Sequence, residues 1–379
     1  MKYLLKQFDR PLLSFSVEED LASPVLNILW IDEANRNRLP LDLHPDNDGL
    51  SRWIRRRTIP KNRAYVHALL ARCGLNLNRP MSIMAMCKGL SLNDCYWIVE
   101  EGFQGSFDQY NLYENRFSQV LGLVAFTGYG SSVRASLESS PEFTTNGMLP
   151  KCWRRVNGRV MLYKGGTSGA SNTGNEPYSE YYAAQVAQAM KIDAIPYGLS
   201  RWKGILCSTC ALFTSRAYAY MPVGHIVTQG GLAAVFDFYQ QLGEDYAQAF
   251  RDMLVFDAVV CNTDRHFGNF GLMIENATNA IARPAPLFDH GNSLFNFAGR
   301  EYLQSAEALQ RYVDTLVPCT YGDFIDTAAR YMNGQNREQL RRLLAFRFRR
   351  HPRYNLLADA LRLIEEQVQK RARTLLNAL

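Results

Sequence analysis

Alternating apolar and polar positions predict a pair of strands in the middle of the chain. Two strand-like runs, Trp153–Val156 and Arg159–Tyr163, flank Asn157-Gly158. Because Asn and Gly both tolerate the positive φ angles of a type I′ turn, this dipeptide between two such runs predicts a β-hairpin. Lys164 is therefore expected at the end of a β-strand.

A helix is expected shortly after this hairpin. A polar, glycine-rich loop leads to Glu176-Pro177, and proline suits the first turn of a helix. The predicted helix continues to about Met190. Glu180 shares one helical face with several alanines, so its carboxylate is expected on the side that packs closely.

The remaining apolar pattern predicts further strands and then helices. Segments 194–202 and 204–213 have the short apolar character of strands, and segments 232–242 and 246–260 have helical periodicity. Helical spacing returns over residues 335–379, with a break at His351-Pro352.

The first third of the chain gives weaker signals. Residues 62–75 have helix-like apolar spacing, and Ser91-Leu-Asn-Asp94 resembles a capping box that would open a short helix. Between residues 111 and 150 the composition shifts toward Gly, Ser and Thr, so a domain boundary is expected near residue 120. This third is predicted to be partly helical, and its role does not follow from its residues.

Charge is distributed unevenly along the 379 residues. The chain has 42 Lys+Arg and 36 Asp+Glu, a formal net charge of +6, and residues 335–379 contain eleven of the basic and four of the acidic residues. The basic excess therefore belongs to the C-terminal segment, where a solvated helix face or contacts with nucleic-acid phosphates would both use it. A second basic run over residues 52–63 is expected to be a solvated surface.

Cysteine usage and hydropathy indicate a cytoplasmic protein with reduced thiols. Eight cysteines in a chain of this length do not make the dense framework of a small secreted domain. Cys207 and Cys210 lie in an apolar run without the second pair that a zinc site needs, so a buried strand is expected there. The apolar stretches are shorter than the roughly 20 residues of a membrane span, and no cleavable export signal is expected.

The chemistry is concentrated in Cys261-Asn-Thr-Asp-Arg-His-Phe-Gly-Asn269 and in the later Phe288-Asp-His-Gly. Asp264 and Asn269 stand five residues apart on a loop after a helix, and Asp289 follows an apolar run. Phosphoryl transfer to a hydroxyl needs one carboxylate to orient and deprotonate the acceptor, and an Asn with a second carboxylate to hold Mg²⁺ against the nucleotide phosphates. His266 would contact the transferring phosphate or brace the loop.

The earlier strand and helix complete this arrangement. A lysine at a strand end, Lys164, can pair with the α and β phosphates of a nucleotide, and Glu180 on the next helix can hold that lysine in place. Glu176 competes with Glu180 for this role. His290 is expected to be either a packed structural residue or a regulatory one.

These motifs, together with Leu162-Tyr-Lys164 and Ser179-Glu-Tyr-Tyr182, resemble the HipA-like serine/threonine kinases, a family that includes bacterial toxin kinases. The resemblance covers roughly residues 143–344. It implies an α+β, two-lobed protein-kinase-like fold with an antiparallel β-rich N-lobe that carries one helix, and a mainly α-helical C-lobe. The implied domains are an N-lobe over residues 121–215 and a C-lobe over 216–379 with basic C-terminal helices, preceded by an extra N-terminal region over 1–120.

The resemblance also implies roles for individual residues. Asp264 would be the catalytic base with His266 beside it, Asn269 and Asp289 the Mg²⁺ ligands, Lys164 the lysine on the ATP phosphates and Glu180 its partner. A phosphate-binding loop ahead of the lysine strand would include Thr145, Asn146 and Gly147. Thr144 or Thr145 would take the place of the serine that some members autophosphorylate.

The implied activity is an ATP- and Mg²⁺-dependent protein kinase, a toxin or a regulatory kinase of a bacterium or phage. Its partners would be a protein substrate, an antitoxin-like protein and, through the basic C-terminal helices, nucleic acid. Two alternatives stay open. Asp264-Arg-His-x-x-Asn269 also resembles phosphatidylinositol kinases, so the acceptor could be a lipid or another small molecule. The chain could also be a kinase-like binding module without catalysis.

Overall fold

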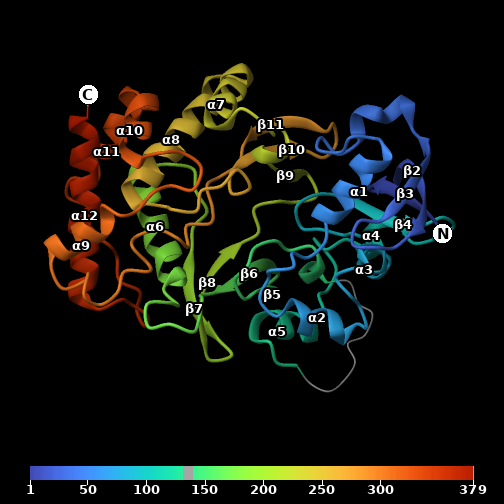
Figure 1. Ribbon diagram of the computed structural model, residues 1–379, viewed down its shortest axis with the longest axis horizontal. Coiled ribbons are helices and arrows are strands. Elements are labelled where there is room, and N and C mark those ends of the chain that lie inside the picture. Colours follow the sequence, from blue (N-terminus) through green and yellow to red (C-terminus); the bar gives the residue numbers. More distant parts are fainter. Residues whose placement is uncertain (131–139, 379) are drawn as a thin grey trace. The chain divides into compact units, whose positions relative to one another are not determined.

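The computed structural model describes residues 1–130 and 140–378 (Figure 1). The chain forms two compact units that are interleaved along the sequence. The first unit contains residues 1–164, 211–221 and 273–282, and the second contains residues 165–210, 222–272 and 283–379. The expected domain boundaries near residues 120 and 215 remain a prediction.

A four-stranded antiparallel sheet begins the first unit, with strand order β3-β2-β1-β4. Its strands are β1 (Lys2–Gln7), β2 (Arg10–Glu19), β3 (Val25–Ile31) and β4 (Tyr96–Glu100). Leu5, Leu13 and Phe15 are fully buried on one side of this sheet, where they pack with side chains of α1 (Asn47–Arg56) and α3 (Pro80–Cys87). The prediction for this third missed its sheet. Strands such as β1 have lysines near both ends, so their apolar pattern is too short to indicate a strand.

Short helices complete the first third of the chain. They are η1 (Glu33–Arg38), α2 (Val66–Arg72), α4 (Phe107–Tyr110), α5 (Gln119–Thr127) and η2 (Pro141–Phe143). Helix α2 lies inside the expected helical range of 62–75. The helix expected after Ser91 is absent: the Ser91 hydroxyl accepts the Asn93 N–H at 3.0 Å in a tight turn, and the chain then enters β4. A serine hydroxyl bound two residues ahead stabilises a turn as readily as a helix start.

The predicted β-hairpin is confirmed in the first unit. Strands β5 (Lys151–Val156) and β6 (Arg159–Gly165) pair antiparallel, and the turn between them has φ angles of 49° at Asn157 and 77° at Gly158. Strands β9 (Tyr218–Pro222), β10 (Gly271–Glu275) and β11 (Ala280–Pro284) form a three-stranded sheet in the order β11-β10-β9.

The second unit is mainly helical. Its elements are α6 (Glu176–Met190), β7 (Gly198–Trp202), β8 (Ile205–Ala211), η3 (Val223–His225), α7 (Gly231–Leu242), α8 (Glu244–Val260), α9 (Ala306–Val313), α10 (Phe324–Tyr331), α11 (Gly334–Arg341) and α12 (Ala358–Asn377). Helix α8 is buried along its whole second half and packs against α7, α10 and α12 (Figure 1). Cys207 and Cys210 lie in β8, which confirms the strand expected there.

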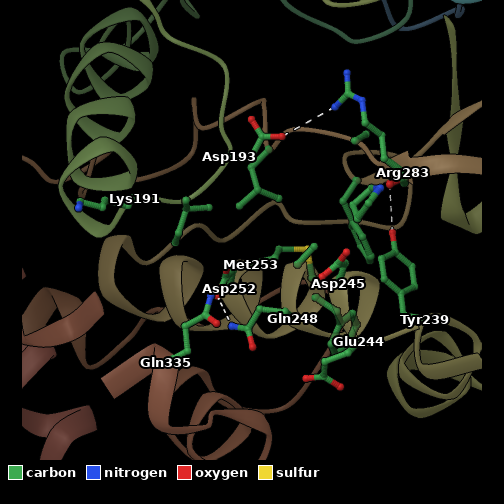
Figure 2. Close-up of a pocket in the computed structure, with 18 of the residues that line it drawn as sticks. Lys191, Asp193, Tyr239, Glu244, Asp245, Gln248, Asp252, Met253, Arg283 and Gln335 are labelled. Carbon is green, nitrogen blue, oxygen red and sulfur yellow. Dashed lines mark hydrogen bonds and ion pairs between the residues drawn. The ribbon is translucent and has the colours of Figure 1, made fainter. Parts of the chain in front are cut away.

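A pocket of about 480 Å³ lies in the second unit (Figure 2). Asp193 and Arg283 form an ion pair at 3.9 Å on its wall, and α8 contributes Glu244 and Asp245. Of the described residues that line it, none belongs to those expected to carry the chemistry. The lining does include Phe270 and Leu287, which are close in sequence to Asn269 and Asp289.

The C-terminal segment is helical over less of its length than its periodicity predicts. Helix α11 ends at Arg341 and helix α12 begins only at Ala358. Between them Phe346 and Phe348 are buried while the intervening arginine is exposed, so the apolar spacing there reflects an extended segment instead of a helix. Among the helices that the structure describes, none combines the length and the apolar character needed to cross a membrane.

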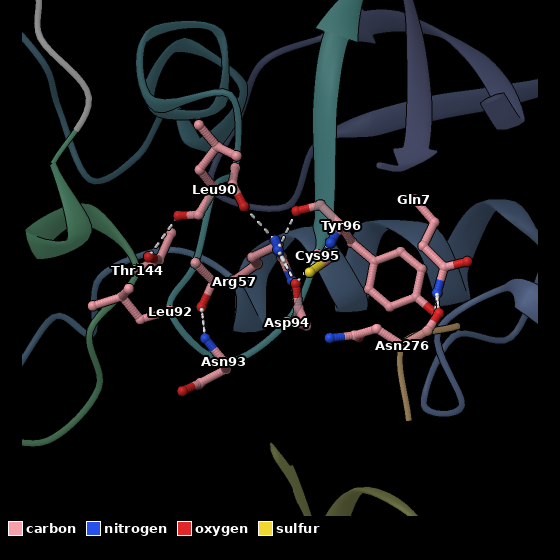
Figure 3. A network of polar contacts seen from close by, with 12 residues as sticks. Gln7, Arg57, Leu90, Leu92, Asn93, Asp94, Cys95, Tyr96, Thr144 and Asn276 are labelled. Atoms are coloured by element: carbon pink, nitrogen blue, oxygen red, sulfur yellow. Dashed lines mark hydrogen bonds and ion pairs between the residues drawn. The ribbon is translucent and has the colours of Figure 1, made fainter. Parts of the chain in front are cut away.

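Two arginines of the expected solvated run are buried in the first unit. Arg57 binds both carboxylate oxygens of Asp94 at 2.6 and 2.7 Å and the carbonyls of Gly89 and Tyr96 at 2.5 Å (Figure 3). Arg63 is paired with Glu142, and the two side chains are 0% and 1% exposed. The expectation of a solvated surface is therefore wrong at these positions, because each guanidinium finds a carboxylate that lies far along the chain.

We expect Arg63→Ala to lower the free energy of unfolding of the first unit by about 3–5 kcal/mol, because it leaves the Glu142 carboxylate buried without its counter-ion. Urea denaturation followed by tryptophan fluorescence measures this, since four of the five tryptophans (30, 53, 97 and 153) lie in that unit. The control is Arg36→Ala, which removes the partner of Glu33 in an ion pair whose side chains are 53% and 65% exposed, and it should cost less than about 1 kcal/mol. Equal losses in the two variants would contradict a structural role for the buried pair.

Candidate functional site

The loop that carries Asp264 begins where helix α8 ends. Cys261 adopts a left-handed conformation with φ of 51° and terminates the helix. Asn262 then binds the chain in two directions: its N–H donates to the Asp257 carbonyl at 3.1 Å, and its side-chain oxygen accepts the Asp264 N–H at 3.2 Å. The backbone of Asp264 is thereby fixed to the last turn of a buried helix.

Arg265 holds the two halves of the motif together. Its side chain is 1% exposed and makes two hydrogen bonds, of 2.8 and 3.1 Å, with the carboxylate of Asp257 on α8. One terminal nitrogen donates to the carbonyl of Asn269 at 3.0 Å and to the carbonyl of Phe288 at 2.6 Å. Burial opposes the charge of Arg265, but the attraction of Asp257 outweighs it and raises the pKa of the guanidinium. A permanently charged side chain thus joins the segment of Asn269 to the residue before Asp289.

Asp264 and Asn269 are joined directly. The side-chain nitrogen of Asn269 donates to the Asp264 carbonyl at 3.3 Å, so its side-chain oxygen faces away from that bond. Asn292 donates to the Asp264 carboxylate at 3.2 Å and receives the Thr263 N–H on its own carbonyl at 3.1 Å. The Asp264 carboxylate is half-exposed, and Asn292 sets its orientation.

Asp289 has an unusual backbone. Its φ is 59°, in the left-handed region that residues other than glycine adopt rarely. Its N–H donates to the hydroxyl of Tyr197 at 3.1 Å, and its carbonyl accepts from the Asn262 side chain at 3.4 Å. The next residue, His290, is fully buried against the rings of Tyr197 and Phe256, at 5.9 and 5.0 Å between centroids. His290 is therefore a packed residue, which is one of the two roles that the sequence left open.

Both candidate glutamates of helix α6 are buried. Glu180 is 0% exposed and accepts a hydrogen bond from the Ser208 hydroxyl of β8. Glu176 is 2% exposed and accepts the Thr167 N–H at 3.1 Å, which closes the glycine-rich loop onto the helix start. The structure thus gives Glu176 a local partner within the loop.

His266 is exposed and bonded within its own loop. Its Nδ1 accepts the Gly268 N–H at 3.1 Å, which corresponds to the bracing role considered for it.

The remaining expected site residues lie in the first unit and are described separately. Lys164 is 6% exposed and stands directly opposite Lys151 in the β5–β6 hairpin. The Lys151 amine donates to the Asn146 carbonyl at 2.9 Å. Gly147 has φ of 94°, a backbone conformation that strains residues with a Cβ, so this turn favours glycine.

Arg63 fixes the backbone of the segment between Glu142 and Lys151. It donates to the carbonyl of Thr145 at 3.2 Å and to that of Lys151 at 2.9 Å. The two threonine hydroxyls are also bound: Thr144 donates to the Leu90 carbonyl at 2.8 Å, and Thr145 donates to the Pro141 carbonyl at 2.7 Å. Thr144 is buried, whereas Thr145 is partly exposed and the next two residues are exposed.

The donor set of the second unit suits a hard cation. Asn269 and Asp289 offer amide and carboxylate oxygens, which Mg²⁺ prefers, and neither offers sulfur or imidazole. Within residues 1–130 and 140–378, no three or more His, Cys, Asp and Glu side chains gather closely enough to hold a metal ion by themselves. The fit to Mg²⁺ therefore rests on the oxygen chemistry of Asn269 and Asp289.

Sequence reasoning missed four residues that support this site. They are Tyr197, Asp257, Arg265 and Asn292. Asp257 carried a readable signal, because an acidic residue inside the apolar run 253–260 needs a cationic partner. Asn292 lies three residues after Asp289, but nothing in the spacing indicates that it turns back to Asp264.

Comparison with known proteins gives structural neighbours only. No family model and no curated protein matches the chain. The solved structure of HipA from Shewanella oneidensis MR-1, in a complex with HipB and operator DNA, is 12% identical with a TM-score of 0.56, and the alignment covers 99% of this chain and 97% of that one. The first third, expected to be an addition to the fold, is thus included.

The crystal structure of CtkA, a proinflammatory kinase of Helicobacter pylori, is 16% identical with a TM-score of 0.51. That alignment covers 63% of this chain and 94% of CtkA. These likenesses agree with the antiparallel sheets and the helical second unit described above. The chain has the mixed α/β fold of the HipA-like kinases, as its motifs imply.

Proposed function

We propose that this protein is an ATP- and Mg²⁺-dependent protein serine/threonine kinase in which Asp264 is the catalytic base. The observation that carries the proposal is the clamp of Arg265, which binds the carbonyls of Asn269 and Phe288 and is anchored on Asp257. One buried side chain thus gathers the base, the amide ligand and the segment of the second carboxylate. Phosphoryl transfer requires this set in one place.

The oxygen of the acceptor hydroxyl attacks the γ-phosphorus of ATP while Asp264 accepts the proton of that hydroxyl. The bond between the γ-phosphorus and the bridging oxygen breaks, and ADP leaves with its electrons. The Asn292 side chain, 3.2 Å from the Asp264 carboxylate, holds that carboxylate in orientation. Asn269 and Asp289 would hold the metal through their side-chain oxygens. Mg²⁺, when bound, supplies charge neutralisation at the phosphates.

The first unit would bind the nucleotide phosphates. Lys164 and the turn of Thr145, Asn146 and Gly147 are the groups proposed for this, with Glu180 as the partner of the lysine. Arg63 supports the assignment because it fixes the carbonyls of Thr145 and Lys151 from within a buried ion pair. A prefolded backbone can present its N–H groups to phosphate without a loss of entropy on binding.

The proposed partners follow from the HipA neighbour and from the charge of the C-terminal segment. The HipA neighbour was solved with HipB and operator DNA. For this chain we propose a protein acceptor, a cytoplasmic toxin or regulatory role, and an antitoxin-like partner. The exposed arginines 349, 350 and 353 between α11 and α12 are the groups available for nucleic-acid phosphates.

The first prediction concerns activity itself. Incubation with Mg²⁺ and ATP should add a phosphoryl mass to the wild-type protein or to a generic protein acceptor, and Asp264→Asn should reduce this rate by roughly 10²–10⁴-fold because it removes the base. The control is Asp359→Asn, an exposed acid in the first turn of α12. Intact-mass spectrometry measures both. Transfer to inositol lipids but to no protein would select the lipid-kinase alternative, and equal rates in wild type and Asp264→Asn would remove Asp264 as the base.

The second prediction separates the roles of Asp289 and Lys164. Asp289→Ala should lower kcat on the order of a thousandfold, because metal-ion stabilisation contributes several kcal/mol. Lys164→Ala should chiefly raise the KM for ATP, by about 10- to 100-fold, since a charge-assisted hydrogen bond to phosphate is lost. Steady-state kinetics at varied ATP and Mg²⁺ resolve the two. An unchanged kcat in Asp289→Ala, or an unchanged KM for ATP in Lys164→Ala, contradicts the role assigned to that residue.

The third prediction tests the basic segment. If arginines 349, 350 and 353 bind phosphates, the affinity for a DNA duplex should fall steeply with salt, and replacing all three by alanine should reduce the slope of log K against log salt by about 2.7. Fluorescence anisotropy at several salt concentrations measures it. A slope unchanged by the triple replacement rejects this surface.

A further inference from the structure

Tyr197 stands at the end of a short parallel pairing that leads to Asp289. The Leu287 N–H donates to the Asp193 carbonyl at 2.9 Å, and the Leu287 carbonyl accepts the Ile195 N–H at 2.8 Å. These bonds form the parallel bridge between Ala194 and Leu287. The segment before β7 and the segment before Asp289 therefore run side by side in the same direction.

Asp289 leaves this pairing at the next step. In a continued parallel ladder its N–H would meet the carbonyl of Ile195. Instead the backbone of Asp289 turns into the left-handed region, at φ of 59°, and its N–H donates to the phenolic oxygen of Tyr197 at 3.1 Å. A side-chain oxygen thus takes the place of a backbone carbonyl, at the residue whose carboxylate is the proposed metal ligand.

Tyr197 contacts this part of the chain at two points. Its ring packs edge-on against His290, and its hydroxyl oxygen accepts the Asp289 N–H. Tyr197 therefore touches both Asp289 and the residue that follows it.

We propose that Tyr197 is a positioning residue that holds Asp289 in its left-handed, metal-binding conformation through the Asp289 N–H bond to the phenolic oxygen. The inference rests on the proposed kinase function and extends it to a residue outside the motifs. Without that bond the N–H of Asp289 loses its acceptor, and a strained backbone loses the contact that offsets the strain. The carboxylate would then sample other directions, and metal affinity would fall.

Tyr197→Phe is the test, because it removes one oxygen and keeps the ring that packs on His290. The apparent dissociation constant for Mg²⁺ in the complex with ADP, measured by calorimetry, should rise about 10- to 100-fold, as is usual when a group that orients a metal ligand is lost. ADP binding in the presence of EDTA should stay unchanged. In kinetics, the Mg²⁺ concentration for half-maximal rate should rise in parallel.

The matched control is Tyr239→Phe. The hydroxyl of Tyr239 is also buried in the second unit, but it donates to the backbone carbonyl of Gly271, at 3.2 Å, outside the pairing of Ile195 with Leu287. Its replacement should leave the Mg²⁺ constant unchanged. Tyr197→Leu, which removes ring and hydroxyl together, should match Tyr197→Phe in Mg²⁺ affinity, whereas a loss confined to the Leu variant would show that ring packing alone matters and would overturn the proposal.

Amide hydrogen exchange tests the same bond without any turnover or metal. In Tyr197→Phe the amide of Asp289 should exchange at least about tenfold faster than in the wild type, while the amides of Leu287 and Ile195, which bond to backbone carbonyls, keep their rates. Unchanged exchange at Asp289 overturns the proposal. A wild-type protein that binds no Mg²⁺-nucleotide would refute the kinase function, yet the exchange rates would still decide whether Tyr197 holds Asp289.

Discussion

The candidate chemistry of the second unit depends on one buried ion pair. Arg265 and Asp257 are almost fully excluded from solvent, and a charged pair in that position is stable only when its remaining donors are also bound. The carbonyls of Asn269 and Phe288 satisfy this requirement. The need to satisfy a buried guanidinium therefore fixes the loop that carries the groups proposed for catalysis.

The first unit also contains a buried arginine whose remaining donors bind backbone carbonyls. Arg63 and Glu142 are buried together, and the donors left over on Arg63 bind the carbonyls of Thr145 and Lys151. In both units a planar, multidentate cation shapes an irregular loop that has too few backbone partners of its own. Lysine in either place would offer a single charged point and could not hold two carbonyls and a carboxylate in a fixed plane.

The residues proposed to touch substrate were more visible in the sequence than those that position them. Asp264, Asn269 and Asp289 have a spacing that suits the proposed chemistry, and the hairpin that contains Lys164 has an unambiguous turn dipeptide. The support is non-local. Asn292 binds Asp264, which precedes it in the chain, and Tyr197 binds Asp289, which follows it. Arg63 pairs with Glu142, which lies far along the chain. The sheet of the first third was missed for a related reason, since β4 joins β1 from nearly a hundred residues away.

The left-handed backbone at Asp289 also limits how this position can change in related sequences. Gly, Asn and Asp adopt that conformation most readily, whereas branched or bulky residues strain it. Asn and Gly accept the same φ of 59° without a negative charge. If the carboxylate of Asp289 holds the metal as proposed, exchange for Asn or Gly is therefore the change that removes the charge and keeps the backbone.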